Sequence, residues 1–266
     1  MEKQALSLAD LRIRFDALQA SSGVSVADAV FRTLRLAIVT MALPPGTRLT
    51  EQDIGDGLRI SRQPVREALL RLRDVELVVI KPQRGSFVAP IAPDAVRSAQ
   101  FVREAVETAI VRQAASVSTA GARDLIEEAL AAQAVAVRRA DAASFFRLDE
   151  QFHRTLATLA GCGPAWRTIE GVKGHMDRVR YLSLPNATPL ERLLAQHRAI
   201  AEGVLSGNAD AAAGAMRAHL REIITSLPIL ADQHPDLFSP TAGALEAGDR
   251  HSDPELPGAD PALERI

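Results

Sequence analysis

Two prolines within four residues, in the segment Pro90-Ile91-Ala92-Pro93, divide this 266-residue chain where its hydrophobic pattern changes. Proline removes a backbone donor and fixes φ, so neither a helix nor a strand is expected to continue through such a segment. Before it, short helical stretches are followed by two short apolar runs, and after it the pattern is helical throughout. A chain of this length is also long enough to form two domains. We therefore expect two domains, at residues 25–90 and 94–230, joined by a linker at residues 91–93.

The first domain is predicted to contain three helices followed by a β-hairpin. Apolar residues recur at helical spacing from Val26, and a Pro-Pro-Gly turn at residues 44–46 ends that helix. A variant capping box at Thr50 begins a second, short helix, and Ser61 caps the third. Two apolar runs then flank the polar turn Lys81-Pro82-Gln83-Arg84-Gly85, which is the pattern of a hairpin.

The second domain is predicted to be an all-helical bundle. Ala and Leu are frequent and only 4% of the residues are aromatic, a composition that favours helices. Glycine, proline or asparagine divides the pattern into six helical stretches, which are residues 94–117, 121–140, 141–161, 164–184, 187–207 and 209–229. Short connections make consecutive helices antiparallel neighbours. The fold class is therefore mostly α, with an antiparallel bundle as its larger part.

The two ends of the chain are expected to lie outside these domains. Residues 1–24 form a leader with one weakly amphipathic stretch, Leu8-Leu11-Phe15-Leu18, which either packs on a partner or frays. Residues 231–266 hold eight acidic residues against Arg250 and Arg265, together with five prolines and three glycines. Such a segment cannot bury enough apolar area to offset its ordering entropy, so we expect an acidic, disordered tail.

Charge and cysteine content limit the possible functions. The net charge is −2, but the acidic tail masks a basic body, and residues 24–90 hold ten Lys or Arg against seven Asp or Glu. This excess supports DNA contact without proving it. Cys162 is the single cysteine, which excludes an intrachain disulfide and fits a reducing compartment. The N-terminal stretch has no uninterrupted apolar core, so a secretory signal or membrane span is not expected there. We expect a soluble, cytoplasmic protein with no membrane partner.

The most specific motif is the run Ser61-Arg62-Gln63-Pro64-Val65-Arg66-Glu67-Ala68-Leu69. It places polar side chains and free backbone N–H groups at the start of the third helix, where they can meet phosphates and base edges. A single exposed arginine is ordinarily a solvated residue paired with an acid such as Glu67. The run does not stand alone, however. Together with Pro44-Pro45-Gly46-Thr47-Arg48-Leu49-Thr50-Glu51 and Arg84-Gly85-Ser86-Phe87-Val88, it closely resembles the GntR family of winged helix-turn-helix regulators over about residues 24–90.

The resemblance implies that the first domain is a winged helix-turn-helix whose third helix enters the major groove. It also implies a double-stranded DNA operator with an inverted repeat, bound by a homodimer. Arg62 and Arg66 would contact guanine or phosphate, and the wing tip would reach the minor groove or its phosphates. The DNA-binding candidates are Arg48, Ser61, Arg62, Gln63, Arg66, Arg84 and Gly85.

Two positions depart from the family pattern. Glu76 stands where the family usually has a glycine before the Leu-Val strand, and Arg59-Ile60 replaces the usual glycine-valine pair before Ser-Arg. The departures concern the start of the hairpin and the turn that precedes the third helix.

A set of possible metal ligands falls on three helices of the second domain. Asp149 and His153 are four residues apart, so both project from one helix face, which also carries phenylalanines. His197 and His219 each interrupt an apolar stripe. A single histidine on an apolar face is more often a hydrogen-bonded core residue. Taken together, one carboxylate and three imidazoles suit a divalent transition metal such as zinc or nickel, with coordination positions left for water or a ligand.

The set resembles the FCD-type effector domain of the FadR branch of GntR regulators, over about residues 94–229. A count of six helices rather than seven would place the chain nearer the VanR-like subgroup. The resemblance implies a small carboxylate effector, one of whose oxygens replaces metal-bound water while Arg103 neutralises its charge. An equally expected role for Arg103 is a salt bridge to Glu107 on the same helix. Mixed residues of the later helices are assigned to ordinary packing, namely Trp166, His175, Arg178, Arg180 and Tyr181.

These observations predict a DNA-binding regulator, a repressor released when the effector changes the angle between the domains. No enzymatic activity is expected. The alternative is a metal-dependent hydrolase with an appended DNA-binding domain, because an open metal site could activate water. A hydrolase also needs a positioned acid or base, and Glu150 lies on a neighbouring helix face.

Overall fold

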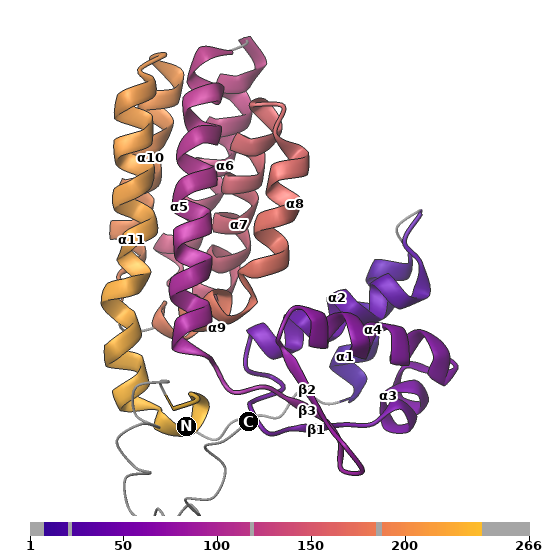
Figure 1. Ribbon diagram of the computed structural model, residues 1–266. Helices are drawn as coiled ribbons and strands as arrows, with labels where there is room; N and C mark the ends of the chain where they lie inside the picture. The colour runs from indigo at the N-terminus through magenta and orange to yellow at the C-terminus, as the bar shows by residue number, and fades with distance from the viewer. Residues whose placement is uncertain (1–7, 21–22, 118–119, 185–187, 241–266) are drawn as a thin grey trace, which may run out of the picture.

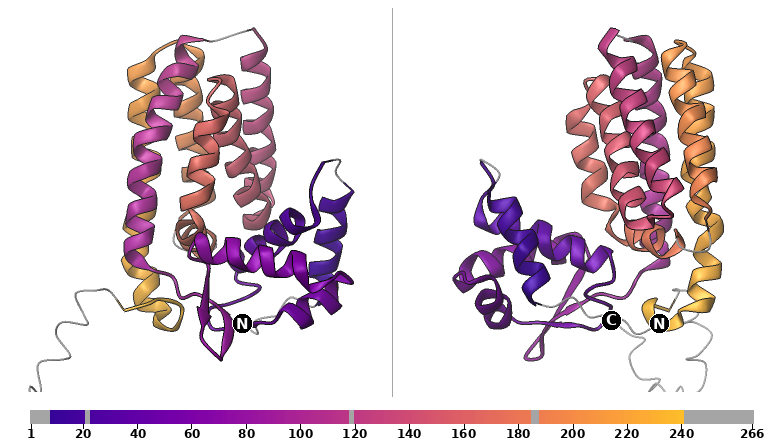
Figure 2. Two further views of the ribbon diagram at one scale, coloured as in Figure 1. Left: turned by 45° about the vertical axis from the view of Figure 1, so that its right-hand side comes forward. Right: turned by 180° about the vertical axis from the view of Figure 1, so that it is seen from behind.

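The computed structural model describes residues 8–20, 23–117, 120–184 and 188–240. It shows a mostly α-helical chain in which a small N-terminal domain lies beside one end of an upright helical bundle (Figure 1). A view from behind shows the same arrangement, with the small domain touching only the lower end of the bundle (Figure 2). Among the described residues, no helix is long and apolar enough to cross a membrane.

The N-terminal domain is a winged helix-turn-helix, as predicted. Its helices are α1 (Leu8–Gln19), α2 (Val26–Val39), α3 (Glu51–Leu58) and α4 (Arg62–Asp74), and its strands are β1 (Arg48–Leu49), β2 (Val78–Lys81) and β3 (Gly85–Val88). The hairpin pairs β2 with β3 in the register Val78 to Val88. Strand β1 was not expected, and it pairs with the other edge of β3, giving the antiparallel order β1-β3-β2. This third strand joins Arg48 to the wing.

The leader is part of this domain's core. Helix α1 buries Leu11 and Phe15 against the same cluster that holds the inner faces of α2, α3 and α4. Arg12 also donates a hydrogen bond of 2.9 Å from its Nη1 to the Leu58 carbonyl at the end of α3. The expectation that the leader frays or packs on a partner is therefore wrong for residues 8–19, because its apolar face has an intramolecular partner.

The helix starts follow the sequence signals with one difference. The Thr50 side chain accepts a 3.0 Å hydrogen bond from the Asp53 amide, as the capping box predicts. Ser61 occupies the N-cap position of α4 with extended backbone, but its side chain makes no capping hydrogen bond. The amides of the first turn of α4 are thus left for another acceptor, such as a DNA phosphate.

The two departures from the family glycine pattern occur at strained backbone positions. Arg59 ends α3 with φ 52°, and Glu76 precedes β2 with φ 59°. Both values lie in the left-handed region, which glycine adopts more readily than residues with a Cβ. The turns that the family builds with glycine therefore keep their conformation in this chain, at some local cost.

Among its described residues, the second domain contains seven helices, and they form a bundle. They are α5 (Pro93–Ser116), α6 (Ala120–Arg138), α7 (Ala142–Leu159), α8 (Gly163–Val172), α9 (Gly174–Ser183), α10 (Leu190–Leu205) and α11 (Ala209–Gln233). The single helix predicted at residues 164–184 is wrong, because the chain turns at the buried Lys173. A Cβ at Gly174 would lie 3.1 Å from the Leu77 side chain, so α9 packs closely on the N-terminal domain. With seven helices, the count no longer supports the VanR-like subgroup.

The linker and the start of the tail are ordered together. Helix α11 runs past residue 230 to Gln233, and a 3₁₀ turn (Pro235–Leu237) follows. Ile91 is fully buried and forms a parallel bridge with Phe238, in which the Ile91 amide donates to the Leu237 carbonyl at 2.8 Å. The predicted disorder is therefore wrong for residues 231–240, because their backbone groups pair with the linker. The remainder of the predicted tail, residues 241–266, lies outside the described residues.

Helices α10 and α11 approach each other closely at Gly203, which gives a stability prediction. A Cβ at Gly203 would lie 2.5 Å from the Ala212 nitrogen, so Gly203→Ala forces backbone movement between the two helices. We expect it to destabilise the fold by about 1–3 kcal/mol, measured by urea unfolding. Gly214→Ala is the matched control, since a Cβ there meets nothing within 4 Å. Unchanged stability of the Gly203 variant would contradict the close approach.

Candidate functional site

The structure brings together the four predicted metal ligands inside the bundle. Asp149 and His153 come from α7, His197 from α10 and His219 from α11. All four side chains are buried, and one potential ligand atom from each lies within 4.8 Å of the others. The His219 Nε2 is 3.1 Å from the His153 Nε2 and 3.4 Å from the His197 Nε2. The Asp149 Oδ1 lies 3.4 Å from the His197 Nε2.

Each of the three imidazoles is held from behind through its other nitrogen. The His197 Nδ1 lies 2.7 Å from the Gln133 Oε1, and the His219 Nδ1 lies 2.9 Å from the Gln196 Oε1. The His153 Nδ1 lies 2.5 Å from a Glu107 carboxylate oxygen. An amide oxygen or an ionised carboxylate can only accept, so each Nδ1 carries the proton and each Nε2 presents a lone pair to the centre.

The electrostatics of this cluster fit a bound cation. Burial lowers the pKa of His219 well below its usual range, and the His197 and His153 rings lower it further. Burial also lowers the pKa of His197. These histidines therefore stay in the neutral form that metals bind. Burial alone would raise the pKa of Asp149, but Arg180 and His197 outweigh it and hold that carboxylate ionised. Converging lone pairs and a buried negative charge suit a divalent transition metal, and three nitrogens with one oxygen suit zinc or nickel.

Arg103 makes the salt bridge expected for it and, within the described part of the chain, keeps part of its guanidinium unpaired. It is buried on α5, and its Nε donates to the Glu107 carboxylate, which is the ion pair expected on one helix. Its Nη2 has no partner among the described residues. Burial would raise the pKa of Glu107, but Arg103 and His153 lower it to about 2. One edge of the Arg103 guanidinium is therefore fixed by Glu107, and the other has unused hydrogen-bonding capacity.

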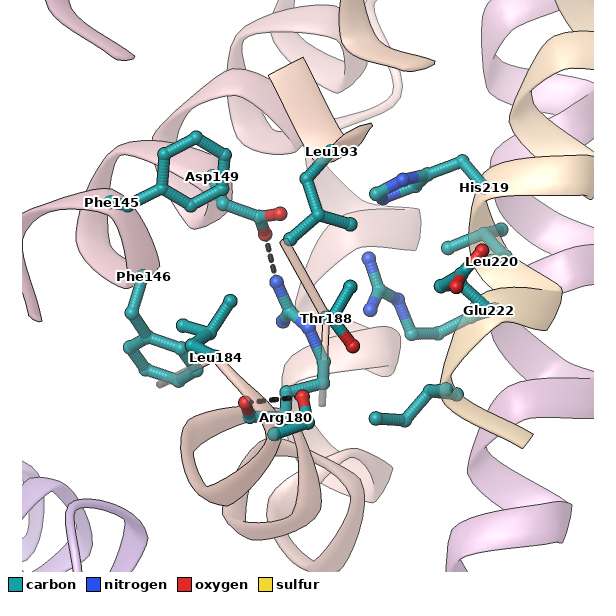
Figure 3. A pocket seen from close by; sticks show the side chains of 13 residues that line it. Phe145, Phe146, Asp149, Arg180, Leu184, Thr188, Leu193, His219, Leu220 and Glu222 are labelled. Carbon is teal, nitrogen blue, oxygen red and sulfur yellow. Dashed lines mark hydrogen bonds and ion pairs between the residues drawn. The ribbon is translucent and has the colours of Figure 1, made fainter. Parts of the chain in front are cut away.

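A small pocket lies beside the ligand cluster. Its volume is about 40 Å³, enough for a few water molecules. Arg180 reaches across this pocket to Asp149, and His219 projects from the opposite side (Figure 3). The lining residues are Arg103, Phe145, Phe146, Asp149, Arg180, Ser183, Leu184, Thr188, Leu193, His219, Leu220, Glu222 and Ile223.

Arg180 lines the site, although the sequence did not predict it there. It was assigned to ordinary packing, yet it donates to the Asp149 Oδ2 and lies over the Phe146 ring. The prediction of one helix at residues 164–184 overlooks Gly171 and Gly174, which flank the break between α8 and α9, so it does not assign the face that carries Arg180. The other residues assigned to packing, Trp166, His175, Arg178 and Tyr181, do not line the pocket.

The DNA-binding candidates lie on the exposed parts of the N-terminal domain. Ser61, Arg62, Gln63 and Arg66 are exposed at the start of α4. Arg62 donates to the Gln52 side chain at 2.9 Å, and Arg66 pairs with Glu51 at 2.8 Å. Helix α3 thus orients these arginines before any DNA is bound.

The wing candidates lie at the tip of the hairpin. Arg84 is exposed there, and Gly85 has φ +100°, which a residue with a Cβ rarely adopts. A Cβ at Gly85 would lie 3.7 Å from the Arg48 Nε, so strand β1 places Arg48 beside the tip. Their contacts to DNA remain a prediction.

The amide behind His197 gives a prediction on metal affinity. Gln133→Leu removes the acceptor of the His197 Nδ1 proton with little change of volume. We expect the affinity for Zn²⁺ to fall about 10- to 100-fold, because outer hydrogen bonds orient metal-binding imidazoles. Isothermal titration calorimetry measures it, with the exposed Gln113→Leu as the control. Native affinity in the Gln133 variant would show that this hydrogen bond does not support a ligand.

Comparison with known proteins assigns both domains. Residues 26–88 match the bacterial regulatory proteins of the gntR family, and residues 100–222 match the FCD domain. The HTH-type transcriptional repressor RspR of Escherichia coli K12 is 40% identical over 210 residues, 79% of this chain and 92% of that protein. The chain belongs to the GntR family, with an FCD-type second domain.

Other relatives of this GntR regulator agree with that assignment. An HTH-type regulator from an unstable DNA locus of Streptomyces ambofaciens is 35% identical, over 81% of this chain and 91% of that protein. The solved structure of E. coli McbR/YncC superposes with a TM-score of 0.68 at 20% identity, over 79% of this chain and 99% of that one. That structure supports the fold alone. The chain is thus a transcriptional regulator with a DNA-binding domain.

Proposed function

We propose that this GntR regulator is a homodimeric repressor that a small organic acid releases from its operator by binding at a metal site in the FCD domain. The observation that carries the proposal is the buried cluster of Asp149, His153, His197 and His219, whose lone pairs converge beside a pocket. A bound zinc or nickel ion would supply Lewis acidity and positive charge there. The E. coli relative RspR is a transcriptional repressor by name, which supports repression rather than activation for this chain.

The pocket supports a carboxylate as the effector. The free Nη2 of Arg103 is a buried donor without a partner, and burying such a group costs free energy unless a ligand satisfies it. Arg180 also lines this pocket, so a second guanidinium is available to an anionic ligand.

The exposed candidates at the start of α4 and at the wing support binding of double-stranded DNA. Two N-terminal domains related by a two-fold axis would match an inverted repeat, which is the reason to propose a dimer. The contacts of Arg62 and Arg66 with acceptors on α3 would hold both guanidinium groups in position for contacts with DNA.

The hydrolase alternative is less well supported by the ionic contacts around the site. Glu150 accepts from the Lys173 ammonium at 2.8 Å, and Glu107 is held by Arg103 and His153. Neither carboxylate is placed as a free acid or base beside the ligands. Turnover of small esters or amides by the zinc-loaded protein would favour the hydrolase.

Fluorescence anisotropy of the full chain with DNA from upstream of its own gene tests the proposed function. We expect binding that resists scrambled competitor DNA and weakens steeply as salt rises. We also expect a candidate organic acid to weaken it, and a metal chelator to remove the response to the acid. An acid response that survives complete metal removal would overturn the metal-dependent mechanism.

A further inference from the structure

Helix α9 touches both the ligand cluster and the N-terminal domain. It lies at the end of the bundle nearest that domain (Figure 1). The His175 Nε2 lies 2.9 Å from the Glu76 carbonyl, and the Arg178 Nη1 donates to the Ala89 carbonyl at 2.8 Å. The His175 Nδ1 accepts from the Ala92 amide at 3.1 Å. A displacement of α9 therefore acts on the wing and on the linker together.

The hydrogen-bond partners of the four candidate ligands belong to different helices. Glu107 and the two glutamines behind the histidines belong to α5, α6 and α10 of the bundle. The partner of Asp149 is Arg180, which belongs to α9 (Figure 3). Arg180 also donates from its Nη1 to the Asp177 Oδ1 at 3.3 Å. One ligand of the cluster is thus connected to the interdomain helix.

The chain of charges continues into the N-terminal domain. The Asp177 Oδ2 accepts from the Arg35 Nη2 at 3.1 Å and from the Lys173 Nζ at 2.6 Å. Arg35 lies on α2, which packs against α4. The Asp177 side chain is 2% exposed, and those of Arg180 and Arg35 are 12% and 23% exposed. Ionic contacts at such burial are weakly screened by water and salt, so a change at one end is felt at the other.

We propose that Arg180, Asp177 and Arg35 form a relay that couples occupancy of the metal site to the position of the DNA-binding domain. A cation held by Asp149 and the three histidines would add positive charge beside Arg180 and weaken its hold on Asp149. Arg180 would then pair more strongly with Asp177, which it shares with Arg35 and Lys173, and the contact between α9 and α2 would loosen. Arg180 acts here as a positioning residue. The relay rests on the proposed metal site and adds its connection to DNA binding.

The test measures the arrangement of the domains directly, without an operator. Spin labels are placed on α3 and α6 by Asp56→Cys and Asp124→Cys in a Cys162→Ser background, since both acids are exposed. Labelled full-length chain is diluted with unlabelled chain, so that distances within one protomer dominate. Electron–electron double resonance then gives the distance distribution with and without Zn²⁺, and calorimetry on the same samples gives Zn²⁺ affinity.

We expect Zn²⁺ to shift or broaden the distance distribution of the parent protein. The Arg35→Gln variant should lose this response, although it should still bind Zn²⁺ with an affinity within about tenfold of that of the parent protein. Arg35 contacts no ligand of the cluster, so its loss leaves the site intact. Arg112→Gln, which removes an exposed ion pair with Asp210, is the control and should keep the full response.

The outcomes separate the relay from the metal site. A full response in the Arg35→Gln variant, or no response in a parent protein that binds Zn²⁺, overturns the relay and leaves the proposed function standing. Failure of the parent protein to bind Zn²⁺ overturns both. Arg180→Lys is a second variant, which keeps the positive charge but removes the guanidinium that donates to both Asp149 and Asp177. It should reduce the effect of Zn²⁺ on the distance distribution.

Discussion

Replacing His219 with alanine is expected to lower the affinity for Zn²⁺ by more than about 100-fold, a larger loss than for any outer partner. His219 has the central Nε2 of the cluster, which lies close to the nitrogens of both His153 and His197. Its removal leaves three candidate ligands and opens the site toward the pocket that His219 lines. Calorimetric titration of the metal-stripped protein measures the loss.

His234→Ala is the matched control for this experiment. His234 is exposed after α11 and lies outside the cluster, so its loss should leave the affinity unchanged. Circular dichroism distinguishes loss of the site from loss of the fold. A folded His219→Ala protein with parental affinity would show that the cluster is a hydrogen-bonded core and not a metal site.

Replacing Arg66 with alanine is expected to weaken operator binding about 5- to 150-fold, the range for loss of a two-bond contact between an arginine and a base. Arg66 is exposed, and Glu51 holds its guanidinium in place, so part of the cost of ordering the side chain is met before DNA binds. Anisotropy at two salt concentrations measures the effect. A base contact would leave the salt slope unchanged, whereas a phosphate contact would lower it by about one.

Arg73→Ala provides the control on the same helix. Arg73 lies in the last turn of α4, where it pairs with Asp74, and it is exposed to a similar degree. We expect its loss to change operator affinity by less than about threefold. Equal losses in both variants would indicate a general effect of positive charge instead of a specific role for the start of α4.

Much of the site could be predicted because its residues follow local rules. Asp149 and His153 share a helix face by their spacing, and His197 and His219 interrupt apolar stripes that must face the core. The capping signal at Thr50 likewise depends on neighbours only three residues away. Patterns of this kind depend only on residues that are close together in the sequence.

The features that could not be predicted depend on contacts between distant segments. Helix α9 begins at Gly174, where it packs on Leu77. The only local signals for the break are Gly171 and Gly174, and a helix tolerates isolated glycines at a cost of about 1 kcal/mol each. Gln133 is 64 residues from the histidine that it orients. Arg180 is 31 residues from Asp149, and its role depends on a pocket formed by several helices. Only the assembled bundle shows these partners.

The pairing of Ile91 with Phe238 has a consequence for how the FCD domain could be transferred to another protein. It brings the two ends of the FCD domain side by side, an arrangement that is common in domains that can be inserted into another chain. A chimera cut at the end of the family match, residue 222, would leave the buried Ile91 without its backbone partner. The exchangeable unit is therefore residues 91–239, whose boundaries are set by the hydrogen bonds between the linker and residues 237–239 and not by the last candidate ligand, His219.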